Sequence, residues 1–468
     1  YSWDDYDVFR KVPGNMPQPE VLEKYLRYPI TMVPDTFGRD ENYARHHEVD
    51  IETQLPRVGI HPEFLYQASR YRANRYAEGM KKALQNRELI KECLNEYRDE
   101  QHKMKPEDVY WPVAAFCCKC NKDETEILDY DGEYGVTYKC KACGHEEKGD
   151  LRTSKEFKLG WRVDWPMRWN EEKVVFEPGG KDHISPGGSY DTAKLVSKKV
   201  FGWDAPVTMK YDFVKLKGVP GKMSSSKGKV ISLVDALEVY QPEVLRYIFA
   251  MNKVDHEFSI SFDLDVVTIY EAYDKTERIA WGIDKAKNED LFLKEKRIYE
   301  LSQIENGMPK VQPYQIAFRL LTTLLQTYSG DIDAVIASLK DVKEEQKETL
   351  RRRCECAWYW IKESAPDCAP DFCFTLREDG SKAEDISGEM LTAVRRVRDE
   401  VVPRLDTFAV DKECQQAMYD IATELGLESK ALFTALYHAL IGKDQGPRLA
   451  SFFRIIGKEK LQKILSVY

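Results

Sequence analysis

The spacing of apolar residues divides the chain into helical and strand-forming stretches. From about residue 42 to 104 the pattern is largely helical, and within residues 76–98 apolar side chains recur between charged ones. These apolar positions are Met80, Leu84, Leu89, Ile90 and Leu94. The pattern predicts amphipathic helix that packs one face against a core.

The pattern changes twice further along the chain. Residues 112–150 combine short strands, turns and paired cysteines, and residues 158–262 are mixed α/β. Strands are expected near 174–177, 209–215 and 230–233, and a helix over 233–249. From about residue 264 the pattern is helical almost to the end. We therefore expect residues 1–40 to open an α/β domain, 41–157 to form an insertion, 158–263 to complete the domain, and 264–468 to be all-helical.

Composition narrows the class of protein. The 468 residues suggest about three domains at ~100–200 residues each. The sequence contains no run of ~18 apolar residues, so it indicates neither a membrane span nor a membrane partner. A net charge of −9 argues against coating nucleic acid by bulk charge, although local basic patches remain compatible with RNA binding. Eleven clustered cysteines are unlike a secreted disulfide framework and favour the reducing cytoplasm.

Paired cysteines predict a metal site within residues 112–150. Cys117-x-x-Cys120 and Cys140-x-x-Cys143 match a zinc ribbon, in which two turns each give two thiolates to a tetrahedral Zn²⁺. Four protein ligands leave no open position, so the zinc is expected to be structural. Cys118 makes the first pair ambiguous, and buried or fortuitous cysteines are the alternative.

The segment Gly221-Lys-Met-Ser-Ser-Ser-Lys-Gly228 suits a polyphosphate. Its glycines permit close backbone approach, its hydroxyls donate hydrogen bonds to phosphate oxygens, and its lysines supply compact positive charge. Such a loop can stabilise the charge that develops when a bond to an α-phosphate breaks. The alternative is a Ser/Gly/Lys turn that contacts only water.

Three other segments carry candidate chemistry, each with a structural alternative. Acids at Asp4, Asp5 and Asp7 either grip a cation at a strand end or cap a helix. Trp161, Trp165 and Trp169, at four-residue spacing, either hold a cationic substrate or belong to a core. The third segment, Gly179-Gly-Lys-Asp-His183, can place the Asp182 carboxylate on a ribose hydroxyl but is weak by itself.

Together these segments resemble the class I lysyl-tRNA synthetases. The resemblance spans nearly the whole chain, although residues 284–430 are similar only in helical character. The matching stretches are residues 3–13, 161–169, 176–183, 189–192, 221–231 and 441–452. The tryptophan segment and Gly-Lys-Asp-His distinguish this family from the glutamyl-tRNA synthetases.

The resemblance implies a Rossmann-type catalytic domain, an inserted zinc ribbon and an α-helical anticodon-binding region. It implies a cytoplasmic monomer that joins lysine to lysine tRNA through a lysyl-adenylate, using ATP with Mg²⁺. Lys222 and Lys227, with Ser224 and Ser226, would stabilise the leaving pyrophosphate. ATP would bind Gly180, Asp182, His183 and Met223; lysine would bind Asp4, Asp5, Trp161, Asp164, Trp165 and Tyr211.

The chain departs from this family in three places. The upstream His-x-Gly-His-like signature is absent, so we expect the first strand and helix of the domain, and part of the ATP site, to precede residue 1. Ser225 stands where many class I enzymes have the second lysine, so Lys222 and Lys227 are expected to act jointly. Relatives can carry a second zinc site with the pattern Asp-x-x-x-Cys-His-x-x-x-x-x-His. In this chain Asp35 and His46 remain, but Arg39 and Asp40 replace the Cys and the His. We predict no zinc there.

Two other functions fit parts of the pattern. A zinc-ribbon RNA-binding protein without catalysis is disfavoured by the loop at 221–228 and by Gly-Lys-Asp-His. Another class I-like nucleotidyl transferase, acting without tRNA, is disfavoured by the long helical C-terminal region.

Overall fold

The computed structural model describes residues 1–219 and 231–468, which form two compact units. Unit 1 contains Tyr1–Val234 and Asn252–Ile260, and unit 2 contains Asp235–Met251 and Ser261–Tyr468. The chain therefore leaves unit 1, builds two helices that lie largely or wholly in unit 2, and returns to unit 1 before completing unit 2. The four-part division expected from the sequence stays a prediction.

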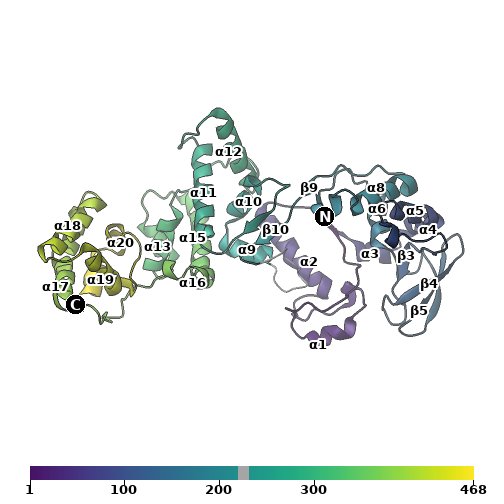
Figure 1. Cartoon of the computed structure of the whole chain (residues 1–468), viewed down its shortest axis with the longest axis horizontal. Helices are drawn as coiled ribbons and strands as arrows, with labels where there is room; N and C mark the ends of the chain where they lie inside the picture. Colours follow the sequence, from purple (N-terminus) through teal and green to yellow (C-terminus); the bar gives the residue numbers. More distant parts are fainter. Residues whose placement is uncertain (220–230) are drawn as a thin grey trace. The chain divides into compact units, whose positions relative to one another are not determined.

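Several helices of unit 1, α3 to α6 and α8, lie close together at one end of the unit (Figure 1). The helical stretch 76–98 is divided at Asn86, whose side-chain amide donates to the carbonyl of Lys82 at 2.8 Å. The helices of this unit are α1 (Pro19–Leu22), α2 (Tyr43–Gln54), α3 (Gln67–Arg72), α4 (Ala77–Gln85), α5 (Arg87–Asn95), α6 (Trp161–Glu171), α7 (Lys181–Ile184) and α8 (Ser189–Val196).

Antiparallel strands build the cysteine-rich ribbon, as the sequence predicts. Strands β4 (Thr125–Tyr130), β5 (Gly135–Cys140) and β6 (Glu146–Asp150) form one sheet, and β3 (Val113–Ala115) pairs with β7 (Phe157–Leu159). The turn between β4 and β5 is fixed by Asp131, whose Oδ1 accepts from the N–H groups of Glu133 and Gly135. Gly132 supplies the positive φ of 89° that this turn requires.

Parallel pairs form the α/β part of unit 1. They join β1 (Ser2–Trp3) to β2 (Leu65–Tyr66), β8 (Gly179–Gly180) to β9 (Lys210–Tyr211), and β10 (Val214–Leu216) to β11 (Phe258–Ile260). Among the described residues these pairs do not merge into one continuous sheet. The strand expected at 174–177 is reduced to a parallel bridge between Phe176 and Val207. The N–H groups of Glu177 and Gly179 continue the hydrogen bonding past Pro178, to the carbonyls of Val207 and Met209, each at 3.0 Å.

A single apolar core fills the ribbon side of unit 1. One face of α4 and of α5 packs against the strands of the ribbon and against α6 and α8. Buried members include Met80, Leu84, Ile90, Tyr138 and Phe157. The amphipathic pattern therefore identified a helical core face correctly, and the shared core holds the cysteine ribbon to the helices that carry the tryptophans.

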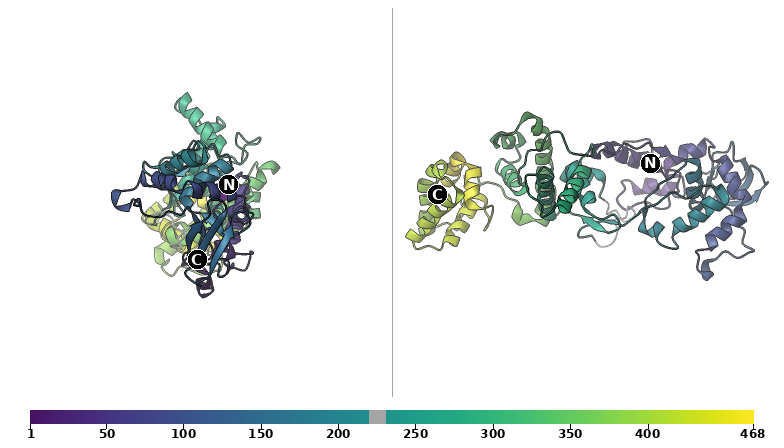
Figure 2. Two further views of the ribbon diagram at one scale, coloured as in Figure 1. Left: turned by 90° about the vertical axis from the view of Figure 1, so that its right-hand side faces the viewer. Right: turned by 90° about the horizontal axis from the view of Figure 1, so that it is seen from above.

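Unit 2 is helical throughout its described residues, which confirms that expectation. Its C-terminal helices gather as one yellow cluster in the right-hand view of Figure 2. The helix expected over 233–249 is two helices, because Pro242 begins a new one. The helices are α9 (Leu233–Val239), α10 (Pro242–Met251), α11 (Asp265–Ala280), α12 (Glu289–Ser302), α13 (Phe318–Thr327), α14 (Ile332–Ser338), α15 (Lys347–Tyr359), α16 (Ala365–Cys368), α17 (Gly388–Arg396), α18 (Asp411–Glu424), α19 (Ser429–Ile441), α20 (Leu449–Ile456) and α21 (Lys458–Leu465).

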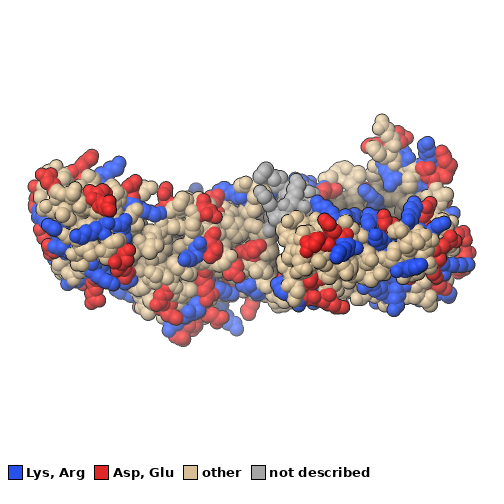
Figure 3. Space-filling model, turned by 90° about the horizontal axis from the view of Figure 1, so that it is seen from below, with Lys and Arg blue, Asp and Glu red and all other residues tan. Residues whose placement is uncertain are grey.

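Surface charge is mixed in sign. On the face drawn in Figure 3, basic and acidic side chains are interspersed over both units. The net charge of −9 is therefore compatible with local basic contacts. Among the described helices, none combines the length and apolar character that a bilayer crossing requires.

Candidate functional site

The predicted zinc ligands converge in the ribbon. Sγ of Cys117 lies 3.7 Å from Sγ of Cys143, and Sγ of Cys120 lies 3.6 Å from Sγ of Cys140. Zn–S bonds of about 2.3 Å in a tetrahedron place sulfurs about 3.8 Å apart. The donor set therefore fits a four-thiolate zinc ion, which would stabilise the fold and leave no position for a substrate.

Two matching turns place these sulfurs. The N–H of Asn121 donates to the carbonyl of Cys117 at 2.8 Å, and the N–H of Gly144 donates to that of Cys140 at 2.9 Å. Both donors have left-handed backbone, with φ of 61° and 74°. The backbone N–H of His145 lowers the pKa of Cys143 to about 7, which favours the thiolate that a metal binds. Cys117, and not Cys118, thus belongs to the four-sulfur cluster.

An acid-lined cavity of about 310 Å³ lies at the end of β1. Its lining residues come from the β1 segment, from Ile30 and from α2: Tyr1, Ser2, Trp3, Asp4, Asp5, Ile30, Tyr43, Ala44, His47 and Glu48. The sequence predicted the strand-end acids, but the contribution of α2 required the fold. A cavity with several carboxylates suits a cationic ligand.

The three candidate lysine-binding acids differ in what they already contact. Asp5 is buried and its carboxylate accepts from the N–H of Ala68 at 2.7 Å, near the start of α3. Asp164 is buried and binds the hydroxyl of Tyr71 and Nε of Arg168, the latter at 3.0 Å. Asp4 pairs with Arg168 at 2.8 Å but keeps 61% of its side chain exposed. Asp4 is therefore the acid most available to a ligand.

The tryptophans of α6 form a ladder. The rings of Trp161 and Trp165 stack with centroids 5.5 Å apart, and those of Trp165 and Trp169 lie 4.9 Å apart. Trp169 is buried, whereas Trp161 is 42% exposed. His183 lies beside the exposed end, 5.5 Å from Trp161. One end of the ladder thus belongs to the core and the other offers ring faces at the surface. Binding of a cationic substrate on those faces stays a prediction.

Glu177 holds this ladder in place and was not identified from the sequence. Its two carboxylate oxygens accept from Nε1 of Trp165 at 2.9 Å and from Nε1 of Trp169 at 2.6 Å. A single carboxylate thereby fixes the orientation of two indoles. The spacing of the tryptophans drew attention to them, but the sequence has no pattern that assigns their acceptor.

The glycine segment brings the candidate ribose contact close to Tyr211. β8 and β9 place Gly180 opposite Tyr211, and a Cβ added at Gly180 would lie 2.9 Å from Oδ1 of Asp182 and 3.6 Å from the Tyr211 ring. Nδ1 of His183 lies 2.8 Å from Oγ of Ser189, at the start of α8. The lack of a side chain at Gly180 lets the Asp182 carboxylate lie close to the backbone, and a Cβ there would displace that carboxylate. The predicted loop residues Lys222, Met223, Ser224, Ser226 and Lys227 lie outside the described residues.

The segment from Asp35 to Asp50 contains an internal cation. Nη2 of Arg39 lies 3.0 Å from Nε2 of His46 and 2.8 Å from Oδ1 of Asp50. Burial would raise the pKa of Asp35, but three backbone N–H donors outweigh it and lower the pKa to about 2. The guanidinium supplies one positive charge among these acids and pairs with Asp50. The absence of zinc there stays a prediction.

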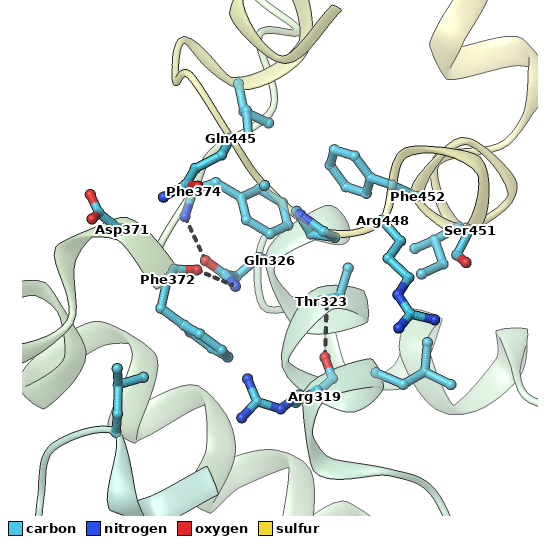
Figure 4. A pocket seen from close by; sticks show the side chains of 16 residues that line it. Arg319, Thr323, Gln326, Asp371, Phe372, Phe374, Gln445, Arg448, Ser451 and Phe452 are labelled. Atoms are coloured by element: carbon cyan, nitrogen blue, oxygen red, sulfur yellow. Dashed lines mark hydrogen bonds between the residues drawn. The ribbon is translucent and has the colours of Figure 1, made fainter. Parts of the chain in front are cut away.

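A larger pocket, of about 610 Å³, lies within unit 2 (Figure 4). Gln326 of α13 is buried; its amide donates to the carbonyl of Phe372 at 3.4 Å and accepts from the N–H of Phe374 at 2.6 Å. Phe374 packs edge to face on Phe452 at 5.2 Å. The Arg448 side chain is exposed, and its guanidinium has no hydrogen-bond or ion-pair partner within the described ranges. The pocket thus combines aromatic surface with a free cation.

Comparison with known proteins defines the class. The family of tRNA synthetases class I (K) matches residues 1–305. Among similar proteins, the lysine–tRNA ligase of Treponema pallidum is 54% identical over all of this chain and 87% of its own length. That of Borreliella burgdorferi is 46% identical over all of this chain and 88% of its own length. That of Thermococcus kodakarensis is 40% identical over 99% of this chain and 88% of its own length.

The fold and the site therefore define a class I aminoacyl-tRNA synthetase. Within that class, the chain belongs to the tRNA synthetases class I (K). The family resemblance deduced from the sequence is confirmed.

Proposed function

We propose that this chain attaches lysine to lysine tRNA in two steps. The lysine carboxylate attacks the α-phosphorus of ATP, whose bond to pyrophosphate breaks, and lysyl-adenylate forms. A terminal ribose hydroxyl of the tRNA, the 2′-OH by family resemblance, then attacks the carbonyl and releases AMP. The observation that carries the proposal is family membership across residues 1–305, with a 54%-identical lysine–tRNA ligase over the whole chain.

Side chains of unit 1 support lysine as the amino acid. Asp4, held by Arg168 at the rim of the acid-lined cavity, would bind one ammonium group, as carboxylates do in charge-assisted hydrogen bonds. The exposed face of Trp161 would pack on the aliphatic stem. Asp5 and Asp164 would position the residues around the substrate and not contact it themselves, because their carboxylates already have partners.

ATP would bind around the β8–α7 turn and the loop at 221–228. Asp182 would accept from a ribose hydroxyl, with Gly180 and His183 beside it, and Tyr211 would line the amino-acid side. Bound Mg²⁺ supplies positive charge to the phosphate oxygens. Lys222 and Lys227, with Ser224, Ser226 and Met223, would contact the phosphates and stabilise the leaving pyrophosphate.

Lysine-dependent ATP–pyrophosphate exchange tests this assignment. In an enzyme with a complete ATP site, we expect exchange with lysine but not with glutamate or arginine. Lys222→Ala should lower the exchange rate by about 10²–10³ while leaving the dissociation constant of lysine unchanged, because the contact strengthens only as charge develops. Lys253→Ala, an exposed lysine outside the loop, is the matched control. An unchanged exchange rate in Lys222→Ala would contradict the role of the loop.

For tRNA, we propose that the pocket of unit 2 takes an unpaired nucleotide of the anticodon. Single-stranded bases are bound by stacking on aromatic rings, and their phosphates by arginine. Phe374 and Phe372 offer the rings, Gln326 fixes the backbone that carries them, and Arg448 offers an unpaired guanidinium.

Salt dependence of tRNA binding tests this second part separately. Loss of one phosphate contact in Arg448→Ala should reduce the slope of log affinity against log salt by about 0.7, as for single strands. Arg351→Ala removes an arginine that pairs with Asp333 on the surface, and its slope should stay unchanged. Equal slopes in both variants would refute the pocket assignment. Binding of tRNA without any exchange would instead favour the non-catalytic RNA-binding alternative.

A further inference from the structure

A second group of metal-ligand atoms lies on the zinc ribbon, outside the four-sulfur cluster. Sγ of Cys118 lies 3.3 Å from Nε2 of His145 and 3.8 Å from Oε2 of Glu147, and the last two atoms are 3.1 Å apart. The three atoms thus form a small triangle of one thiol, one imidazole and one carboxylate. Neither lysine binding nor ATP binding, as proposed above, uses any of these residues.

The size of the triangle matches one face of a zinc coordination tetrahedron. With bonds of about 2.3 Å to sulfur, 2.0–2.1 Å to nitrogen and 2.0–2.2 Å to oxygen, the sides of such a face are about 3.4–3.6 Å. The three observed separations, 3.3, 3.8 and 3.1 Å, each lie within about 0.3 Å of those values. A single ion can therefore reach all three atoms with small side-chain adjustments.

The backbone that carries these side chains is held by the ribbon. The N–H of Cys118 donates to the hydroxyl of Tyr138 at 2.9 Å, and Tyr138 is fully buried. Glu147 lies on β6, and His145 lies just before β6, directly after the second cysteine turn. The two residues are two positions apart, so their side chains lie on the same face. A donor set built on hairpin backbone is more ordered than one built on a free loop.

The side chains are also open to solvent. Cys118 is exposed, and the side chains of His145 and Glu147 keep 27% and 40% of their surface accessible. Three protein ligands leave a fourth position to water or to an incoming group, unlike the closed four-thiolate cluster. Mixed sulfur, nitrogen and oxygen donors suit zinc among the common divalent ions.

We propose that Cys118, His145 and Glu147 form a second, exchangeable zinc site on the ribbon. The Cys118 thiol would lose its proton on binding, and neutral His145 would bind through Nε2. The open fourth position makes this ion removable under conditions that leave the four-thiolate zinc in place. This proposal does not depend on the amino acid that the enzyme activates.

Cobalt titration of the zinc-loaded full chain tests the proposal. Because zinc already fills the four-thiolate cluster, added Co²⁺ should give a saturable thiolate-to-cobalt charge-transfer band of one ion per chain. Cys118→Ser should abolish that band, and Glu147→Gln should weaken binding at least about tenfold, since loss of even an outer contact costs that much. Cys368→Ser removes an exposed cysteine of unit 2 and should change nothing.

Three results would overturn the proposal. One is the absence of a thiolate band in the native chain, and another is an unchanged titration in Cys118→Ser. The third is a second ion that disappears in His46→Asn but persists in Cys118→Ser, which would place it beside Asp35 and Asp40 instead. Retention of one tightly bound zinc in Cys118→Ser shows that the ribbon remains folded, so loss of the band then reports only on the second site.

Discussion

Removal of Arg168 should destabilise unit 1, because it leaves the buried Asp164 carboxylate without its charged partner. The Arg168 side chain is 7% exposed, and that of its partner Asp164 is 12% exposed. Arg168→Met leaves the Asp164 carboxylate buried with only the Tyr71 hydroxyl as partner. Breaking one side of a buried ion pair costs about 3–5 kcal/mol. The unfolding midpoint of unit 1 should fall by about 6–20 °C, at about 2–4 °C per kcal/mol for a domain of this size.

The loss should depend on pH in a defined direction. Burial raises the pKa of Asp164, while Arg168 opposes that rise. Without Arg168 the native pKa of Asp164 rises further above its unfolded value, so the folded variant takes up a proton more readily than the unfolded chain. The variant should therefore recover stability as the pH falls from about 8 to about 5. Thermal unfolding followed by circular dichroism at several pH values measures this recovery.

Two further variants separate this explanation from a general packing defect. Asp164→Asn in the Arg168→Met background removes the orphaned charge, so the double variant should be more stable than Arg168→Met alone. Arg162→Met, on the exposed side of the same helix, should change stability by no more than about 0.5 kcal/mol. Additive losses, or a deficit that is constant with pH, would refute the reasoning.

Three other predictions follow from the described contacts. Glu177→Ala removes the shared acceptor of two indoles, so the KM for lysine in pyrophosphate exchange should rise more than kcat falls. Glu177→Gln retains one acceptor oxygen and should have a milder effect. A fall in kcat alone would exclude a positioning role for Glu177. Cys140→Ser should lower the tightly bound zinc by one ion and remove hydrogen-exchange protection from β4–β6 but not from α18–α20, as mass spectrometry can show. For His438, burial lowers the pKa, but hydrogen bonds to Asp444 and Asp385 outweigh burial and raise the pKa. The stabilisation from this pairing is therefore complete below the pKa of the unfolded state and is lost as the pH rises through the pKa of the folded state. His438→Gln should cost more stability at about pH 5.5 than at about pH 8.5, and an equal cost at both pH values would contradict the charged pair.

Local patterns were enough to predict the parts of the site that are close in sequence. Each Cys-x-x-Cys pair lies within one turn, so spacing alone indicated the four-sulfur cluster. The four-residue spacing of Trp161, Trp165 and Trp169 singled out three side chains that the structure brings together on helix α6. In both cases the geometry follows from backbone within a few residues.

Contacts between distant segments could not be predicted in this way. Asp5 caps the start of α3, 63 residues away, and Tyr71 meets Asp164 across 93 residues. Both acids looked equivalent to Asp4 in the sequence, and only burial distinguishes them. The helix expected over 233–249 failed for a local reason, since the break at Pro242 was read as part of one periodic stretch.

The route of the chain between the two units also sets the order in which they can be completed during translation. β10 ends at Leu216, but its partner β11 begins only at Phe258. At ~5–20 residues per second, the ribosome takes roughly 2–8 s to synthesise the intervening chain. During that interval β10 lacks its partner strand, and α10 is synthesised before helices α11–α21 of unit 2. The nascent enzyme therefore presents an open strand edge and an unpacked apolar helix together, which is the kind of surface that chaperones bind.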